Sequence, residues 1–301
     1  AHGWYGAPAL YNEEQAAAWK KVVDRVHAKG GKIFLQLWHM GRQGHSSFSP
    51  KNELVSASAI AVTAGMTKNN KGEAVPYETP RALRTDEVRG VVEDYRRSAE
   101  LAKAADFDGV ELHSGNGYLV DQFLQSVSNQ RTDKYGGSFE NRARFLLEII
   151  DALVSVFPAD RVALRLSPNG AFGSMGSPDN TELFTYVFEK LSHYGLSYLA
   201  ILDGFGFGYH DQGRLLTAFD AKKHFKGTVL ANNSYTRDIA EGVIRSGAAD
   251  FVSFGRPYIS TPDLAERFEQ DLPLNPDASY EVYWDSSKGA KGYCDFPAYK
   301  A

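Results

Sequence analysis

The feature that most constrains the fold of this chain is a regular alternation of short apolar runs with segments of helical periodicity. Six apolar runs have the length and composition of buried β-strands: Lys32–Leu37, Gly109–Leu112, Val162–Leu166, Ser197–Leu202, Thr228–Ala231 and Asp250–Phe254. Strands that alternate with helices favour a parallel sheet covered by helices, because parallel neighbours need a crossover connection. The pattern therefore predicts an α/β fold.

Helical patterns lie between these strands. A first predicted helix begins near Asn12, which with Gln15 forms a capping pair, and ends at Gly30. A second opens at Thr85 and Asp86. The later predicted helices are Phe139–Phe157, Glu182–His193, a poorly patterned segment near Leu215–His224, Arg237–Arg245 and Asp263–Glu269.

One connection is unusually long. The stretch from about residue 41 to residue 84, named the excursion loop here, is rich in Ser, Asn, Gly and Pro. A loop of this length in a compact fold is usually functional. No low-complexity tract or linker divides the chain, so residues 1–301 are predicted to form a single domain.

Composition excludes several classes of function. The net charge of the 301 residues is −4, which gives no basic surface for nucleic acid or for an anionic membrane. No apolar run approaches the length of a membrane span. The single cysteine, Cys294, excludes an internal disulfide and favours a reducing, cytoplasmic location. The eight histidines show no spacing typical of a metal site.

Polar side chains suited to catalysis follow the second predicted strand. His113 and Asn116 can both donate hydrogen bonds to one oxygen, and Tyr118 can deliver a proton. This combination suits a reaction in which a carbonyl becomes an enolate and the neighbouring carbon is then protonated. Alternatively, Tyr118 merely packs the loop.

One segment closely resembles the Old Yellow Enzyme family of FMN-dependent ene-reductases, which includes the 12-oxophytodienoate reductase type. This segment runs from Gly109 to Arg144 and reads GVELHSGNGYLVDQFLQSVSNQRTDKYGGSFENRAR, with Phe145 directly after it. The resemblance extends over essentially the whole chain to the C-terminal GYCDFPAY. It implies a TIM (β/α)₈ barrel that binds FMN and uses NADPH or NADH as reductant.

The barrel expected from this resemblance is incomplete in this chain. The resemblance begins after the second barrel strand, so the N-terminal hairpin, the first two strands and the helix between them are absent. A (β/α)₈ barrel needs eight strands to close, and six are recognisable. We therefore expect a fragment, or a chain that needs a complementing N-terminal segment. The alternative is that other residues, such as those of the excursion loop, cover the gap.

Two strand residues are candidates for binding the flavin ring. The amide of Gln36 can pair with the flavin pyrimidine, as the family's glutamine does, although a lone glutamine at a strand end is usually only solvated. Arg165 lies inside an apolar strand, where a cation is costly unless it meets an anion. The resemblance places it against the negative charge of reduced flavin, and a structural salt bridge is the alternative.

The last two predicted strands end in ANNSY and SFGRP. In TIM barrels, the loops after strands seven and eight are the usual phosphate-binding place. The resemblance assigns the FMN phosphate to this region, with the cofactor-binding residues Asn232, Asn233, Ser253, Phe254, Gly255 and Arg256. It assigns the substrate pocket to Trp38, Phe172, Phe207 and Tyr283.

The leading hypothesis is NAD(P)H-dependent reduction of the C=C bond of a small α,β-unsaturated enone or enal. The resemblance implies hydride transfer from flavin N5 to the β-carbon and protonation of the α-carbon by Tyr118. A second hypothesis keeps the flavin but changes the reaction to isomerisation or oxidative demethylation. A third is a truncated, flavin-free barrel that acts as a non-catalytic or complementation-dependent module.

Overall fold

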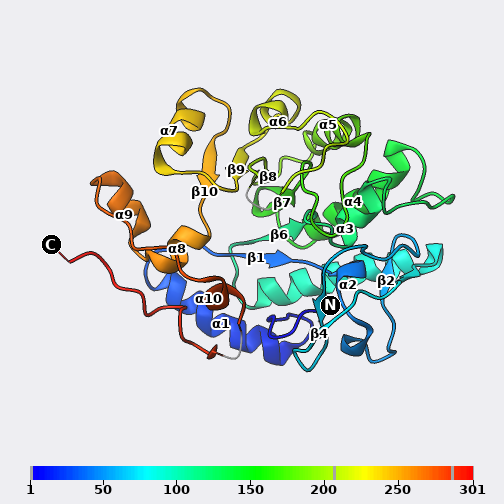
Figure 1. The fold of residues 1–301 in the computed structure, drawn as a ribbon, viewed down its shortest axis with the longest axis horizontal. Coiled ribbons are helices and arrows are strands. Elements are labelled where there is room, and N and C mark those ends of the chain that lie inside the picture. Colours follow the sequence, from blue (N-terminus) through cyan, green and yellow to red (C-terminus); the bar gives the residue numbers. More distant parts are fainter. Residues whose placement is uncertain (1–2, 206–207, 286–287, 301) are drawn as a thin grey trace.

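A six-stranded parallel sheet organises the computed structural model, which describes residues 3–205, 208–285 and 288–300. Its strands lie in the order β1 (Phe34–Leu37), β6 (Gly109–His113), β7 (Val162–Leu166), β8 (Leu199–Leu202), β9 (Val229–Asn232) and β10 (Phe251–Ser253). All neighbours are parallel, and their spatial order follows the chain (Figure 1). The six strands predicted from the sequence are confirmed.

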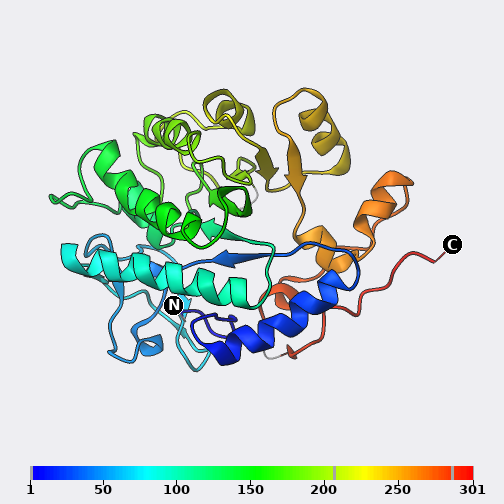
Figure 2. The ribbon, with the colours of Figure 1, turned by 180° about the vertical axis from the view of Figure 1, so that it is seen from behind.

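Helices surround the strands in chain order (Figures 1 and 2). Their bounds are α1 Glu13–His27, α2 Thr85–Ala104, α3 Leu119–Leu124, α4 Phe139–Val154, α5 Asn180–Leu191, α6 Ala218–His224, α7 Arg237–Arg245, α8 Arg256–Ser260, α9 Leu264–Glu269 and α10 Tyr280–Trp284. Every helix predicted from the sequence is present. The described residues contain no helix with the length and apolarity that crossing a membrane requires.

The start of α1 follows the predicted capping residue with one difference. The side chain of Asn12 accepts a hydrogen bond from the backbone N–H of Gln15, as an N-cap residue does. The side chain of Gln15 accepts from the backbone N–H of Tyr11 at 2.8 Å. In the predicted capping pair, Gln15 would accept from the backbone N–H of Asn12. In the structure it accepts from Tyr11, one residue earlier.

The two faces of the sheet differ in chemistry. Val110, Leu112 and Leu164 are fully buried and contribute to the apolar core that the sheet shares with the helices. Because side chains alternate along a strand, Glu111 and His113 of β6 point to the opposite face. The parallel register pairs His113 with Arg165 of β7, so the polar side chains gather on that second face.

The excursion loop forms its own small elements beside the main sheet. Its bounds are η1 Gly41–Gln43, η2 Ser46–Phe48, β2 Val55–Ser56, β3 Thr67–Lys68, β4 Ala74–Val75 and β5 Arg81–Ala82. Strand β2 pairs with β5, and β3 pairs with β4. Over the described residues, these short strands do not add to the six-stranded sheet, so the loop does not extend the sheet by hydrogen-bonded strands there.

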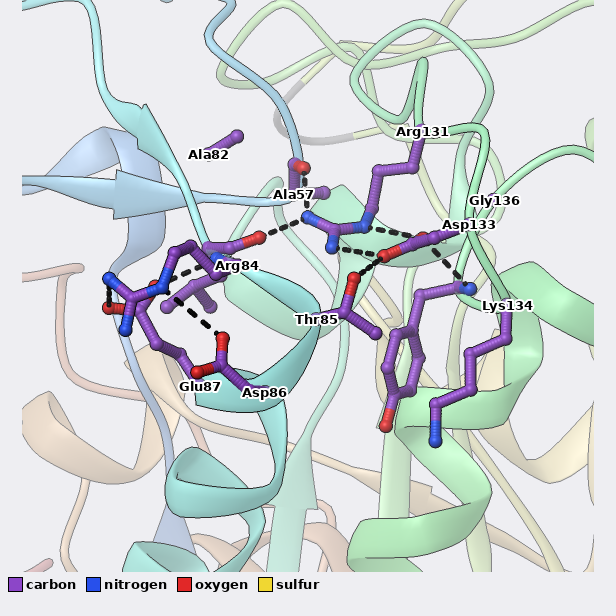
Figure 3. Close-up of polar contacts among 12 residues, drawn as sticks. Ala57, Ala82, Arg84, Thr85, Asp86, Glu87, Arg131, Asp133, Lys134 and Gly136 are labelled. Carbon is purple, nitrogen blue, oxygen red and sulfur yellow. Dashed lines mark hydrogen bonds and ion pairs between the residues drawn. The ribbon is translucent and has the colours of Figure 1, made fainter.

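Arg131 fastens the excursion loop to the segment between α3 and α4 (Figure 3). Its Nη1 donates to the backbone carbonyls of Ala57, at 2.9 Å, and Leu83, at 2.5 Å. Its other nitrogens donate to the carboxylate of Asp133, which also accepts from the hydroxyl of Thr85 at the start of α2. Part of the segment Gly109–Arg144, which carries the family resemblance, therefore attaches the excursion loop to the rest of the fold.

The outer edge of β1 borders a cavity of about 750 Å³. Strand β1 lines it together with Trp19 of α1 and Val91 and Tyr95 of α2. The Tyr95 hydroxyl is buried and has no hydrogen-bond partner among the described residues. Within the described part of the chain, β1 and β10 each have one neighbouring strand, so the sheet stays open at both ends.

Candidate active site

Two hydrogen-bond donors meet just beyond the end of β6. The side-chain nitrogen of Asn116 lies 3.5 Å from Nε2 of His113. The backbone N–H of Gly115 donates to Nδ1 of His113 at 3.4 Å, which leaves the ring proton on Nε2. Two N–H groups so close together are arranged to share one external acceptor, such as a carbonyl oxygen.

His113 is neutral at ordinary pH. Its side chain is buried, and burial, followed by repulsion from Arg165, lowers its pKa to about 3. The imidazole therefore acts as a neutral donor, and its state does not change between pH 5 and pH 9. A neutral donor stabilises an enolate oxygen through a hydrogen bond without giving up a proton.

Tyr118 lies beside this donor pair. Its ring makes edge contacts with the rings of Trp38, at a centroid distance of 4.8 Å, and His113, at 5.0 Å. Burial, with a smaller contribution from the nearby phenol Tyr77, raises the pKa of Tyr118 to about 12. The phenol therefore keeps its proton at neutral pH, which a general acid requires.

The same face of the sheet carries a polar chain that includes Gln36. Its Nε2 donates to Glu111 at 2.5 Å, and the hydroxyl of Tyr198 donates to the other carboxylate oxygen at 2.8 Å. Glu111 thus fixes the orientation of the Gln36 amide, and among the described residues nothing else bonds to that side chain's carbonyl or second N–H. Arg165 lies on this face too, and burial lowers its pKa while Glu111 opposes that shift.

A second cavity, of about 870 Å³, lies at the carboxyl ends of β9 and β10. Seven of the eight predicted cofactor-binding residues line it: Arg165, Asn232, Asn233, Ser253, Phe254, Gly255 and Arg256. The eighth, Gln36, lines the cavity along β1 instead. Asn232 joins them, because its Oδ1 accepts from Arg165 at 2.9 Å and its Nδ2 donates to the hydroxyl of Ser253 at 2.8 Å. The structure therefore brings together the predicted residues of β7, β9, β10 and the loops that follow β9 and β10.

The predicted substrate-pocket residues have different positions. Trp38 touches Tyr118, and the backbone carbonyl of Phe172 packs closely against Gly117, which directly follows Asn116. Tyr283 instead interacts electrostatically with Arg256, beside the second cavity. Phe207 lies outside the described residues. The described side chains include no cluster of three metal-binding groups.

Sequence reasoning missed Tyr77 and Glu111. Tyr77 comes from the excursion loop and is distant from Tyr118 in the chain, so no local pattern joins the two phenols. Glu111 had a usable signal, because it precedes His113 by two residues and therefore shares its face of β6. An acidic residue in an otherwise apolar buried strand needs partners, and here these are Gln36 and Tyr198.

Comparisons with known proteins show which proteins the whole chain resembles. The model of the NADH:flavin oxidoreductase / NADH oxidase family matches residues 1–275. The chain is 39% identical over 305 residues to 12-oxophytodienoate reductase 1 of Oryza sativa subsp. japonica, a match that covers 99% of this chain and 77% of that protein.

Solved structures give the same result. Morphinone reductase in complex with tetrahydroNAD superposes with a TM-score of 0.90 at 38% identity, covering 100% of this chain and 82% of that chain. The old yellow enzyme homologue from Zymomonas mobilis gives a TM-score of 0.91 at 36% identity, with coverages of 98% and 82%. The predicted TIM-barrel class of flavin oxidoreductases is confirmed.

Proposed function

Because the chain belongs to the NADH:flavin oxidoreductase / NADH oxidase family, we propose that it reduces the C=C bond of small α,β-unsaturated carbonyl compounds with NADPH or NADH. FMN is the cofactor of this family, and it supplies the hydride-transfer chemistry when bound. The observation that carries the proposal is the pair of donors His113 and Asn116, 3.5 Å apart and next to a protonated Tyr118.

The residues present fit FMN. Arg165 is a largely buried cation that interacts with Glu111 and bonds to Asn232, so it can offset negative charge on the flavin ring. Gln36 would hold the pyrimidine edge with the polar groups that Glu111 leaves open. Gly255 and Arg256 line the second cavity, where the phosphate would lie.

The chain's own side chains define the substrate step. His113 and Asn116 would hold the carbonyl oxygen and stabilise the charge that develops there. Tyr118 would release its phenolic proton to the α-carbon. Trp38 and Phe172 would border the substrate, and the buried setting of His113 and Tyr118 keeps water from competing for their hydrogen bonds.

The test of the proposed function is product analysis. The purified, FMN-loaded protein is incubated with NADPH and 2-cyclohexenone in the absence of oxygen. We expect cyclohexanone, formed in equal amount to the NADPH consumed. Isomerised or demethylated products with suitable substrates, and no saturated ketone, would assign another flavin reaction to the site. A protein that binds no FMN, either alone or joined to the complementing segment proposed below, would contradict the proposal altogether.

Arg256→Ala should raise the Kd for FMN about tenfold or more, because a charge-assisted hydrogen bond to phosphate is lost. The quenching of flavin fluorescence on binding measures this Kd. Arg237→Ala is the matched control, because Arg237 lines the same cavity and its ion pairs with Asp238 and Asp271 hold it at the cavity wall. Equal FMN affinity in the two variants would contradict the phosphate assignment.

We also propose that a complementing segment with two further strands closes the barrel. Three features of the described part of the chain support this: the open outer edges of β1 and β10, the cavity along β1, and the Tyr95 hydroxyl that has no partner there. Joining a segment that carries the first two barrel strands of a relative should raise both Tm and FMN affinity, whereas a scrambled segment should not. A 301-residue chain that is already monomeric, FMN-replete and cooperative in unfolding would contradict this proposal.

A further inference from the structure

The backbone of Asn116 has an unfavourable conformation that something must hold. Its φ is +55°, in the left-handed region. Asparagine tolerates this region better than most residues but still less readily than glycine. Such a conformation persists where surrounding contacts determine it. The Asn116 amide reaches to 3.5 Å from His113 from this backbone, so whatever holds the backbone also helps to set the spacing of the two donors.

Hydrogen bonds hold Asn116 from both sides. Its backbone N–H donates to Oγ of Ser167 at 2.5 Å, and its carbonyl accepts from Nε2 of Gln43 at 2.5 Å. Ser167 directly follows strand β7, and Gln43 lies in η1 at the start of the excursion loop. Both side chains are buried, with exposed fractions of 3% and 2%. Losing either donor or acceptor would leave a backbone group of Asn116 without its partner.

Gln43 fits between two glycines with positive φ. A Cβ added at Gly117 would lie 2.6 Å from Nε2 of Gln43, and one added at Gly173 would lie 2.5 Å from it. Both distances are too short for any side chain there. Gly117 follows Asn116, and Gly173 follows Phe172. The amide of Gln43 therefore lies where the loop that carries Asn116 meets the loop that carries Phe172.

The preceding residue, Arg42, fixes the second of these loops. Its Nη2 donates to the carbonyls of Gly173 and Ser174, both at 3.0 Å. Its Nη1 donates to the carbonyl of Ile60 in the excursion loop at 3.3 Å. With an exposed fraction of 1%, this guanidinium has little freedom to move. The adjacent side chains of Arg42 and Gln43 thus join the excursion loop to the loop of Asn116 and to the loop of Gly173.

We propose that Gln43 is a positioning residue for the carbonyl-binding pair, acting through the left-handed backbone of Asn116, with Arg42 holding the adjoining loop. This inference rests on the function proposed above. His113 belongs to a strand and is fixed by the sheet, whereas Asn116 belongs to a loop. Gln43 therefore positions Asn116, which is the member of the donor pair with more freedom to move.

The test compares Gln43→Met with the wild type, both loaded with FMN. Methionine keeps the length of the side chain but lacks the N–H donor. We expect the Kd of p-hydroxybenzaldehyde, followed by its effect on the flavin spectrum, to rise about tenfold. The Kd for FMN should stay within a few-fold of the wild type. Ser167→Ala removes the other partner of Asn116, so it should also raise the Kd of p-hydroxybenzaldehyde and leave the Kd for FMN unchanged. Gln270→Met, at an exposed position, should change neither Kd.

Hydrogen exchange provides a readout that does not depend on activity. In Gln43→Met, the amides of Asn116 and Gly117 should exchange faster than in the wild type, with the amides of β7 unchanged. Parallel losses of Tm, FMN affinity and ligand affinity in both variants would overturn the inference in favour of a purely structural role. Unchanged ligand affinity and unchanged exchange would also overturn it. A wild type without enone reduction refutes the proposed function, whereas the exchange result separately decides the role of Gln43.

Discussion

Tyr118→Phe should lower the rate of enone reduction at least a hundredfold and leave flavin reduction by NADPH nearly unchanged. The substitution removes the phenolic proton but keeps the ring that packs against Trp38 and His113. General acid catalysis typically contributes about 10²–10⁴ in rate. Stopped-flow measurement of the two half-reactions, each followed through the flavin absorption, separates the two effects.

The control for this prediction is Tyr77→Phe. It removes the neighbouring phenol, which affects the pKa of Tyr118, but leaves the acid in place. Its enone reduction should remain within a few-fold of the wild type. If Tyr118 only packs the loop, Tyr118→Phe would retain wild-type rates in both half-reactions, and that result would remove it from the mechanism.

Loss of one carbonyl donor should be nearly as damaging. Asn116→Gly and His113→Phe should each slow enone reduction about 10²–10³-fold, the usual effect of deleting one oxyanion donor. Both should also weaken phenol binding, because a phenolate resembles the enolate. Since the pKa of His113 is lowered to about 3, the wild-type Kd for phenols should follow ionisation of the ligand and show no inflection near pH 6.5.

The comparison of Asn116→Gly with Asn116→Ala separates amide loss from backbone strain. Both variants lack the amide, but only alanine adds a side chain to a residue whose φ is +55°. Equal losses in the two variants assign the effect to the amide. Wild-type phenol affinity in Asn116→Gly would show that His113 alone holds the oxygen.

The sheet was predictable because each strand is a short, separate apolar run with a helical pattern after it. The run Val162–Leu166 matches β7 at both ends. Three short helices, α3, α8 and α10, were not predicted. All six residues of α3 are buried, so it lacks the exposed polar face that reveals a surface helix. The excursion loop was recognised by its composition, but its short strands depend on contacts with one another.

The site was predictable where it depends on strand geometry. Gln36, Glu111 and His113 share a face because side chains alternate and the strands are in parallel register. The support of Asn116 was not predictable in this way. Gln43 and Ser167 reach it from 73 and 51 residues away, and only the folded chain brings them together.

The tethers of the excursion loop have a consequence for how this protein can diversify. Arg131 holds the main-chain carbonyls of Ala57 and Leu83, and Arg42 holds that of Ile60. Every residue type offers such a carbonyl, so these attachments place no demand on side-chain identity at the held positions. Ala57 and Leu83 are buried in the apolar core, so packing restricts their side chains even though the tethers do not. Ile60 is only half-buried, so its side chain can vary while its carbonyl keeps the bond to Arg42 and the loop stays attached.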